Sequence, residues 1–311
     1  MTNQTPKTII IATRNSLLAM WQAEYAAKLI EESFPHIKTQ LLPMTTKGDQ
    51  ILDVTLNKIG GKGLFLKELE QAMLSGDADI AVHSMKDVPA DLPNDFNLCS
   101  VFERHDASDA FVSNKFESFS ELPQNATVGT SSLRRQSQLL AIRPDLNVIP
   151  LRGNVQTRLK KLDAGEYDAI ILATAGLERL EYNDRIKQKL NNKICLSAVG
   201  QGAVGVECLS NREDLIELLS QLTHQDTLKC ITAERTMNRV LNGSCSVAIG
   251  AYAEYKTDTG TITMEAVVCA PDGSRVLHQK ASDADPEEVG LKTAYALLAA
   301  GAQELLDMAN N

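Results

Sequence analysis

Short apolar runs, which predict buried strands, alternate with longer segments of helical periodicity over the first part of the chain. The first run covers residues 8–12 and is followed by a helical pattern over residues 17–33. Further strand-like runs lie at residues 38–42, 78–82 and 98–102. Because strands that alternate with helices are typical of a largely parallel sheet, we expect an α/β lobe here.

The same alternation continues beyond a charged break at residues 103–106, which predicts a crossover into a second lobe. Strand-like runs separated by helical segments follow at residues 109–112, 126–128, 146–151 and 167–172. The glycine-rich segment 199–207 predicts a strand that returns to the first lobe, since glycine allows close approach of the backbone. We therefore expect two lobes joined by a double crossover, with residues 1–102 and 201–222 in lobe 1 and residues 103–200 in lobe 2. Lobes joined in this way would leave a cleft between them and could hinge.

From about residue 223 the pattern changes to that of a third, smaller domain, residues 223–311. A long amphipathic helix over residues 224–241 ends at Asn242-Gly243, a favourable C-cap. Strand-like runs follow at residues 247–255, 261–270 and 275–280, and a final helix is predicted over residues 286–308. This order predicts a small α+β domain with a three-stranded antiparallel sheet covered by helices.

Composition and charge narrow the kinds of partner that the chain can have. A length of 311 residues exceeds one ordinary core, which agrees with two or three domains. The polar start and the lack of a long apolar run predict a cytoplasmic protein that does not enter a membrane. A formal net charge of -9 argues against nucleic acid, because phosphate binding depends on summed positive charge. Clusters of arginine in such an acidic chain indicate a small anionic ligand.

The segment 129–136 has the pattern of an anion site. It joins an apolar strand to a helix through hydroxyl side chains, and its first helical turn carries Arg134 and Arg135. Cations at a helix N-terminus oppose the helix dipole by a few tenths of a kcal/mol each, so the pair indicates a negative partner between them. A solvated basic turn would also explain this segment taken alone. However, arginines recur at three further strand ends, as Arg14, Arg152 with Arg158, and Arg179.

A second group of polar residues follows the strand at 78–82, as Ser84, Lys86 and Asp87. Ligands of open α/β sheets bind at the carboxyl ends of the strands, so this position favours function over a surface ion pair between Lys86 and Asp87. The glycine-rich loop that contains Lys62 lacks the spacing of a phosphate-binding loop, which argues against nucleotide binding.

Six cysteines lie far apart without Cys-x-x-Cys spacing, which favours free thiols over disulfides or zinc ligands, and the five histidines show no metal-ligand spacing. Five of the thiols lie in apolar segments and are expected in the core, at positions 99, 195, 208, 230 and 269. Cys245 lies in a turn after a predicted helix, a position that suits covalent attachment or nucleophilic chemistry. A loop cysteine without a function fits that position equally well.

Seven separate stretches, in order along the chain, resemble the porphobilinogen deaminase (hydroxymethylbilane synthase) family. They are residues 11–14, 60–65, 82–87, 129–136, 151–154, 200–202 and 243–245. The resemblance implies three domains, of which the first two are like periplasmic binding proteins. It also implies a monomeric transferase of haem and tetrapyrrole biosynthesis. Such an enzyme joins four porphobilinogen molecules head to tail, with release of ammonia, to give the linear tetrapyrrole hydroxymethylbilane.

The resemblance further implies a dipyrromethane cofactor, made from two substrate molecules and bound to Cys245 by a thioether. Porphobilinogen carries acetate and propionate groups, for which arginine forks are suitable partners. By position, the resemblance assigns cofactor or substrate contacts to Arg14, Ser16, Lys62, Phe65, Ser84, Lys86, Thr130, Ser131, Ser132, Arg134, Arg135, Arg152, Arg158, Arg179 and Gln201. It assigns the catalytic role to Asp87, whose carboxylate would stabilise cationic intermediates near the pyrrole nitrogens.

A few residues depart from the family pattern. Ser246 and Ala248 stand where glutamine and proline are expected, and Leu17 stands where proline is common, so the turn after Cys245 is expected to be less rigid. The competing hypothesis is a two-lobed carboxylate-binding or sensory protein. It would explain the arginines and the cleft but neither the loop thiol nor Asp87.

Overall fold

The computed structural model of the chain describes residues 7–50, 66–243 and 247–310. Contacts between residues divide this part of the chain into two units. The first consists of residues 7–50, 66–105 and 203–228, and the second of residues 106–202, 229–243 and 247–310. No helix within these described ranges is long and apolar enough to cross a membrane.

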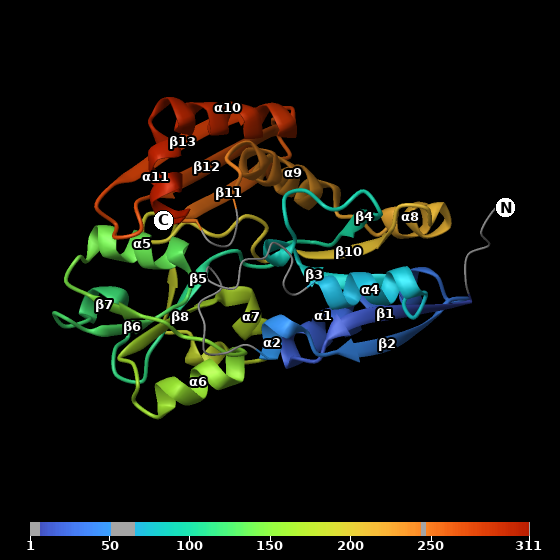
Figure 1. Cartoon of the computed structure of the whole chain (residues 1–311), viewed down its shortest axis with the longest axis horizontal. Helices are drawn as coiled ribbons and strands as arrows, with labels where there is room; N and C mark the ends of the chain where they lie inside the picture. Colours follow the sequence, from blue (N-terminus) through green and yellow to red (C-terminus); the bar gives the residue numbers. More distant parts are fainter. Residues whose placement is uncertain (1–6, 51–65, 244–246, 311) are drawn as a thin grey trace. The chain divides into compact units, whose positions relative to one another are not determined.

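The first unit is built on a five-stranded sheet with the order β2-β1-β3-β10-β4 (Figure 1). Its strands are β1 (Thr8–Arg14), β2 (Lys38–Met44), β3 (Ile80–Ser84), β4 (Phe96–Val101) and β10 (Val204–Leu209). Its helices are α1 (Leu17–Ser33), α2 (Lys47–Gln50), α4 (Lys67–Ser75) and α8 (Glu213–Ser220), and the 3-10 turn η1 (Met85–Asp87) follows β3. β1 runs parallel to β2 and β3, whereas β10 runs antiparallel to β3 and β4. The apolar face of α1, with Ala23, Ala26 and Ile30, packs on Ile9 and Ile11 of β1 in one core.

The second unit contains a sheet of the same design, with the order β7-β6-β8-β5-β9. Its strands are β5 (Asp109–Val112), β6 (Thr127–Gly129), β7 (Asn147–Ile149), β8 (Ala169–Ala173) and β9 (Gln188–Leu190). Helices α5 (Leu133–Ile142), α6 (Val155–Asp163) and α7 (Thr174–Arg179) follow β6, β7 and β8, and the 3-10 turns η2 (Phe119–Glu121) and η3 (Asn183–Arg185) complete the lobe. β6, β7 and β8 are parallel, and β5 is antiparallel to its neighbours. β5 and β10, the first strands after each crossover, thus occupy equivalent places in the two sheets. The predicted pair of periplasmic-binding-protein-like lobes with a double crossover is confirmed.

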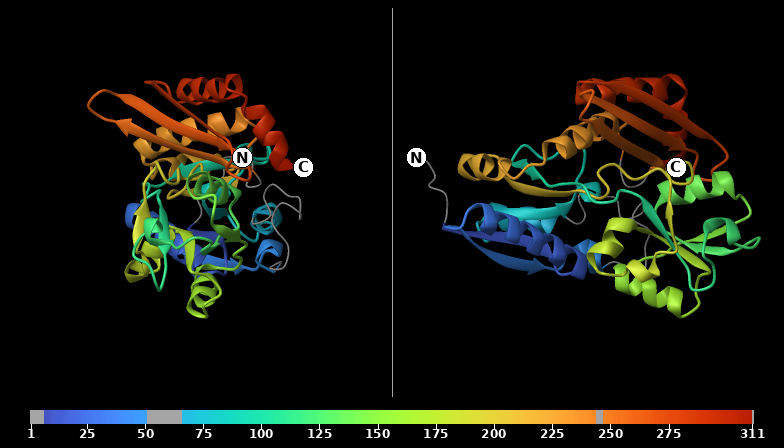
Figure 2. Two further views of the ribbon diagram at one scale, coloured as in Figure 1. Left: turned by 90° about the vertical axis from the view of Figure 1, so that its left-hand side faces the viewer. Right: turned by 180° about the vertical axis from the view of Figure 1, so that it is seen from behind.

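The C-terminal part begins with α9 (Gln225–Val240), whose residues from 229 onward belong to the second unit. Its three strands, β11 (Ile249–Lys256), β12 (Thr261–Cys269) and β13 (Val276–Asp283), form an antiparallel sheet in that order. Residues of α9, α10 (Pro286–Ala299) and α11 (Ala302–Asn310) share one apolar core with this sheet. The right-hand view of Figure 2 shows the ribbon of the sheet from behind. The predicted three-stranded antiparallel sheet is confirmed.

Two element predictions were wrong, and backbone geometry explains both. The final helix, expected over residues 286–308, is two helices, because the chain turns at Gly301 with φ of 98°. The returning strand, expected over residues 199–207, begins only at Val204, since Gly200 and Gly202 have φ of 73° and 89°. Positive φ values are incompatible with extended strand geometry. In addition, α8 and β9 were not anticipated.

Candidate active site

In the first lobe, predicted site residues gather at the carboxyl ends of two neighbouring parallel strands. Arg14 ends β1, and Ser84 ends β3. Ser16 caps α1, and its Oγ accepts a hydrogen bond from the N–H of Ala19 at 3.4 Å. Gln22 of α1 donates from Nε2 to Ser84 Oγ at 2.7 Å, so the helix after β1 also holds the end of β3.

The turn that carries Lys86 and Asp87 is anchored by a buried methionine. Met85, which begins this turn, is 1% exposed, and its N–H donates to the carbonyl of Ala203 at 3.0 Å. Its side chain lies over Gly205 of β10, where an added Cβ would be 2.3 Å from Met85 Sδ. Lys86 and Asp87 are half-buried. Met85 is the first residue of the turn and Asp87 is its last, so the packing of Met85 helps to set the position of the Asp87 carboxylate.

A buried pair of polar side chains lies immediately before this turn. His83 Nε2 and Glu207 Oε2 are 2.7 Å apart, and their side chains are 5% and 1% exposed. The negative charge of Glu207 also acts on Glu70. Burial is the main cause that raises the pKa of Glu70, and the charge of Glu207 raises it further. The pair joins β3 to β10 just below Ser84. Glu207 was not among the predicted site residues, although an acidic residue inside an apolar strand is a visible signal.

In the second lobe, the predicted hydroxyl residues build the turn between β6 and α5. The N–H of Thr130 donates to the carbonyl of Ile149 at 3.0 Å. Ser131 Oγ donates to the carbonyl of Leu151 at 2.9 Å and accepts from its N–H at 3.0 Å. Ser132 caps α5. These contacts hold the ends of β6 and β7 together, with Ser131 and Ser132 half-buried at the turn.

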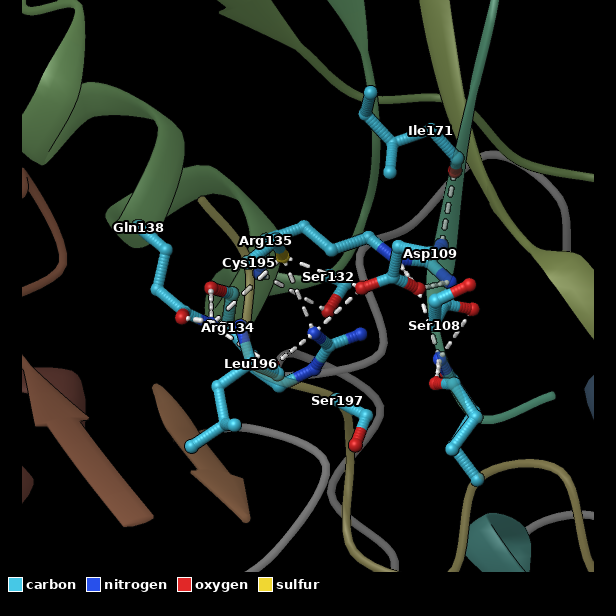
Figure 3. A network of polar contacts seen from close by, with 12 residues as sticks. Ser108, Asp109, Ser132, Arg134, Arg135, Gln138, Ile171, Cys195, Leu196 and Ser197 are labelled. Atoms are coloured by element: carbon cyan, nitrogen blue, oxygen red, sulfur yellow. Dashed lines mark hydrogen bonds and ion pairs between the residues drawn. The ribbon is translucent and has the colours of Figure 1, made fainter. Parts of the chain in front are cut away.

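Arg134 and Arg135 converge on the carboxylate of Asp109, as Figure 3 shows. Arg134 Nη1 lies 2.7 Å from Asp109 Oδ2, and Arg135 Nη2 lies 2.6 Å from Asp109 Oδ1. Arg134 also donates to the carbonyl of Leu196, and Arg135 to that of Ile171. The arginines are 4% and 5% exposed. The structure thus places an acidic side chain of the protein itself between the paired arginines.

Asp109 is the first residue of β5 and was predicted only as the start of a strand. Its signal is an acidic residue that opens an otherwise apolar strand. Burial would raise the pKa of Asp109, but the charges and hydrogen bonds of Arg134 and Arg135 outweigh burial and hold the pKa well below its usual range. Asp109 is therefore ionised in the folded protein.

Three further predicted residues of the second unit, Gln201, Arg179 and Arg158, donate hydrogen bonds to backbone carbonyls of the same unit. Gln201 Nε2 donates to the carbonyl of Ala107 at 2.6 Å and to Asp109 Oδ1 at 3.0 Å. Arg179 donates to the carbonyl of Gly202, and Arg158 to that of Gly153, both at 2.8 Å. Burial lowers the pKa of Arg152, so a carboxylate beside this guanidinium would be stabilising.

Three predicted site residues, Lys62, Phe65 and Cys245, lie outside the described residues, as does Ser246. The prediction that the other five cysteines are core thiols is confirmed, since all five are free and buried. They are Cys99, Cys195, Cys208, Cys230 and Cys269.

The fold and these strand ends define a class of protein, an α/β protein with two lobes of the periplasmic-binding-protein type and guanidinium groups suited to a carboxylate ligand. Comparison with known families makes the assignment specific. Residues 9–217 match the family model described as "Porphobilinogen deaminase, dipyromethane cofactor binding domain", and residues 228–299 match "Porphobilinogen deaminase, C-terminal domain". The chain belongs to the porphobilinogen deaminase family, an enzyme family whose cofactor is dipyrromethane.

Individual relatives agree with this assignment. The porphobilinogen deaminase of Nitrosomonas europaea is 54% identical over 303 residues, which cover 97% of this chain and 98% of that protein. That of Chromobacterium violaceum is 54% identical over 300 residues, 96% of each chain. Among solved structures, the VFT2 domain of Bordetella pertussis BvgS, a double mutant, is similar with a TM-score of 0.45 at 12% identity, over 70% of this chain and 86% of that one. A nutrient-binding protein from Burkholderia cenocepacia bound to methionine has a TM-score of 0.42 at 15% identity, over 68% and 89%.

Proposed function

We propose that this protein is a porphobilinogen deaminase, a transferase that joins four porphobilinogen molecules head to tail with release of ammonia. The product is the linear tetrapyrrole hydroxymethylbilane of haem biosynthesis. The observation that carries the proposal is the placement of Asp87, on a turn anchored by buried Met85, beside the strand ends that bear Arg14 and Ser84. Family membership over nearly the whole chain supports it.

The donor groups of the chain fit a dipyrromethane, which carries acetate and propionate groups like its precursor. Among the described residues, Arg134 and Arg135 share one carboxylate, that of Asp109, and so keep positive charge for a ligand. Burial of Arg152 likewise favours a negative neighbour. We assign carboxylate binding to these arginines and to Arg14, Ser16, Ser84, Lys86, Thr130, Ser131, Ser132, Arg158 and Arg179, with Lys62, Phe65 and Gln201 as further contacts. When bound, the cofactor supplies the pyrrole carbon to which the first substrate is joined.

Asp87 would act on the substrate pyrrole. Its carboxylate can accept a hydrogen bond from the pyrrole N–H of porphobilinogen and stabilise the positive charge that develops as ammonia leaves. A carboxylate is needed for this role because a neutral amide would offer no full negative charge to the cation. Whether Asp87 also passes a proton to the leaving amine is a separate hypothesis, which the pH dependence of turnover tests.

The test of this role is the Asp87→Asn variant, which is isosteric but uncharged. It should keep its fold and its covalently bound cofactor while losing nearly all turnover, and Asp87→Glu should be impaired because its carboxylate is misplaced. Thermal unfolding and intact mass check that fold and cofactor are retained. Near-normal turnover of purified Asp87→Asn would refute the role.

A second experiment tests attachment of the cofactor at Cys245. The denatured wild-type protein should exceed its sequence mass by two pyrrole units, whereas Cys245→Ser should lack the normal thioether-linked addition. A carboxylate-binding or sensory protein would match its sequence mass in both forms. Cytoplasmic location, the monomeric state, the absence of nucleic-acid and membrane partners, and the three domains at residues 1–102 with 201–222, 103–200 and 223–311 stay predictions.

A further inference from the structure

The arginine pair of the second lobe forms a buried cluster with an uneven charge. Within the part of the chain that the structure describes, two guanidinium groups face a single carboxylate, that of Asp109, which is 0% exposed. The fourth ionisable group is Cys195, whose Sγ donates to Asp109 Oδ2 at 3.2 Å. Burial raises the pKa of Cys195 to about 12, so this thiol stays neutral at physiological pH. The cluster therefore carries one net positive charge.

Both oxygens of Asp109 are fully used. Oδ1 accepts from Nε and Nη2 of Arg135, at 3.0 and 2.6 Å, and from Gln201 Nε2 at 3.0 Å. Oδ2 accepts from Arg134 Nη1 at 2.7 Å and from the Cys195 thiol. A carboxylate has about four lone-pair sites, so these five contacts saturate it. Its donors come from the first turn of α5, from residue 195 and from the Gly200-Gln201-Gly202 segment, which makes Asp109 the common partner of three separate parts of the lobe.

The position of the arginines explains why such a partner is needed. Both lie in the first turn of α5, where the helix dipole disfavours cations, and both are nearly excluded from water. Without a counter-charge, two adjacent guanidinium groups would repel one another and move toward solvent. The Asp109 carboxylate holds each of them through an oxygen of its own, so their directions are set before any ligand arrives.

We propose that Asp109 is a positioning residue: it is the internal counter-ion that fixes Arg134 and Arg135 and leaves the pair with charge for one ligand carboxylate. The identity of that ligand rests on the proposed function, whereas the counter-ion role rests on the cluster alone. The two claims are therefore tested by separate measurements.

The first measurement is a stability cycle with Asp109→Ala, Arg135→Gln and the double variant, each followed by thermal unfolding. If Asp109 is a counter-ion, the midpoint of Asp109→Ala falls strongly, and adding Arg135→Gln raises it again because one buried positive charge is removed. A double variant that is less stable than Asp109→Ala would overturn the role. Should Asp109→Ala not fold, Asp109→Asn replaces it, since its amide keeps the size of the side chain.

Formate provides a matched probe, because it has the size of the carboxyl group that Asp109→Ala removes. Sodium formate should raise the unfolding midpoint of Asp109→Ala more than sodium chloride does at the same ionic strength. The increase should be smaller in the wild-type protein, where the Asp109 carboxylate already occupies this position, and in the double variant, which lacks one of the two guanidinium groups. Equal responses of all three proteins to formate would contradict the idea that formate replaces the carboxyl group that Asp109→Ala removes.

The second measurement concerns the ligand and uses Asp109→Glu, which keeps the negative charge but moves it by one methylene. We expect an unfolding midpoint above that of Asp109→Ala because the negative charge is kept, reduced dipyrromethane content by intact mass, and a KM for porphobilinogen raised about tenfold, since small misplacements weaken binding and turnover. Full cofactor content with an unchanged KM would overturn the positioning role. If the wild-type protein itself carries no added mass, the proposed function fails, and the stability cycle still decides whether Asp109 is the counter-ion.

Discussion

Substitution of Gly205 by alanine should displace the turn that carries Asp87, the proposed catalytic residue, without changing Asp87 itself. Gly205 lies in β10, where an added Cβ would meet Met85 Sδ at 2.3 Å and Leu98 Cδ1 at 2.9 Å. Ordinary van der Waals contact begins near 3.4 Å, so the sulfur must retreat by about 1 Å. Leu98 blocks the other side of the new methyl group, and Met85 is 1% exposed, so the methionine side chain has little free space to enter.

Two magnitudes follow from this geometry. Overpacking of a closely packed site typically costs about 1–3 kcal/mol of stability, and we expect Gly205→Ala to fall in that range. Because Met85 begins the turn that carries Asp87, we expect part of this displacement to reach the carboxylate, and a misplacement of about 1 Å can lower turnover by about 10²-fold. The loss of turnover should therefore far exceed what a small fraction of unfolded protein would cause.

Urea unfolding gives the change in stability, and steady-state kinetics with porphobilinogen gives kcat. The matched control is the same substitution in a Met85→Ala background, where the added methyl group enters the space that the methionine side chain leaves. There Gly205→Ala should be neutral or stabilising and should cause no further loss of kcat. If Gly205→Ala lowers stability and kcat equally in both backgrounds, contact with Met85 is not the cause and the reasoning is refuted.

Two further predictions concern buried carboxylates of the second unit. Glu234, which is 0% exposed, accepts hydrogen bonds from the N–H groups of Gly200 at 2.7 Å and Ala253 at 2.8 Å. Glu234→Ala should therefore lower the free energy of unfolding by about 3 kcal/mol or more, and Glu234→Gln, which keeps one carbonyl acceptor, by less; equal losses in urea unfolding would contradict the hydrogen-bond account. The depressed pKa of Asp109 means that its contribution to stability is present above the unfolded value of about 3.9 and is lost as the pH falls below it. Stability measured from pH 6 down to pH 2 should thus fall more steeply in the wild-type protein than in Asp109→Asn, and parallel curves would rule the linkage out.

Features that depend on neighbouring residues could be predicted from the sequence. Hydrophobic periodicity located β1 and α1, because the spacing of apolar residues determines which face of a strand or helix is buried. The same holds for the three strands of the C-terminal sheet and for the thiols of the core. The polar residues at the ends of β3 and β6 were recognisable because each of these strands has a parallel neighbour in its own sheet, and the carboxyl ends of parallel strands lie at the same edge.

Features that depend on distant residues needed the tertiary structure. Asp109 lies 25 residues from Arg134 in sequence, and His83 lies 124 residues from Glu207, yet each pair shares a buried hydrogen bond. No local pattern links such residues, because strand order is set by packing of the whole sheet, which inserts β10 between β3 and β4. The sequence by itself thus determined that paired arginines would stand at the start of α5 and require a negative charge. Only the tertiary structure decided that the protein supplies part of that charge from Asp109, since the start of β5 and the end of β6 come to the same edge, on either side of β8, only when the sheet is assembled.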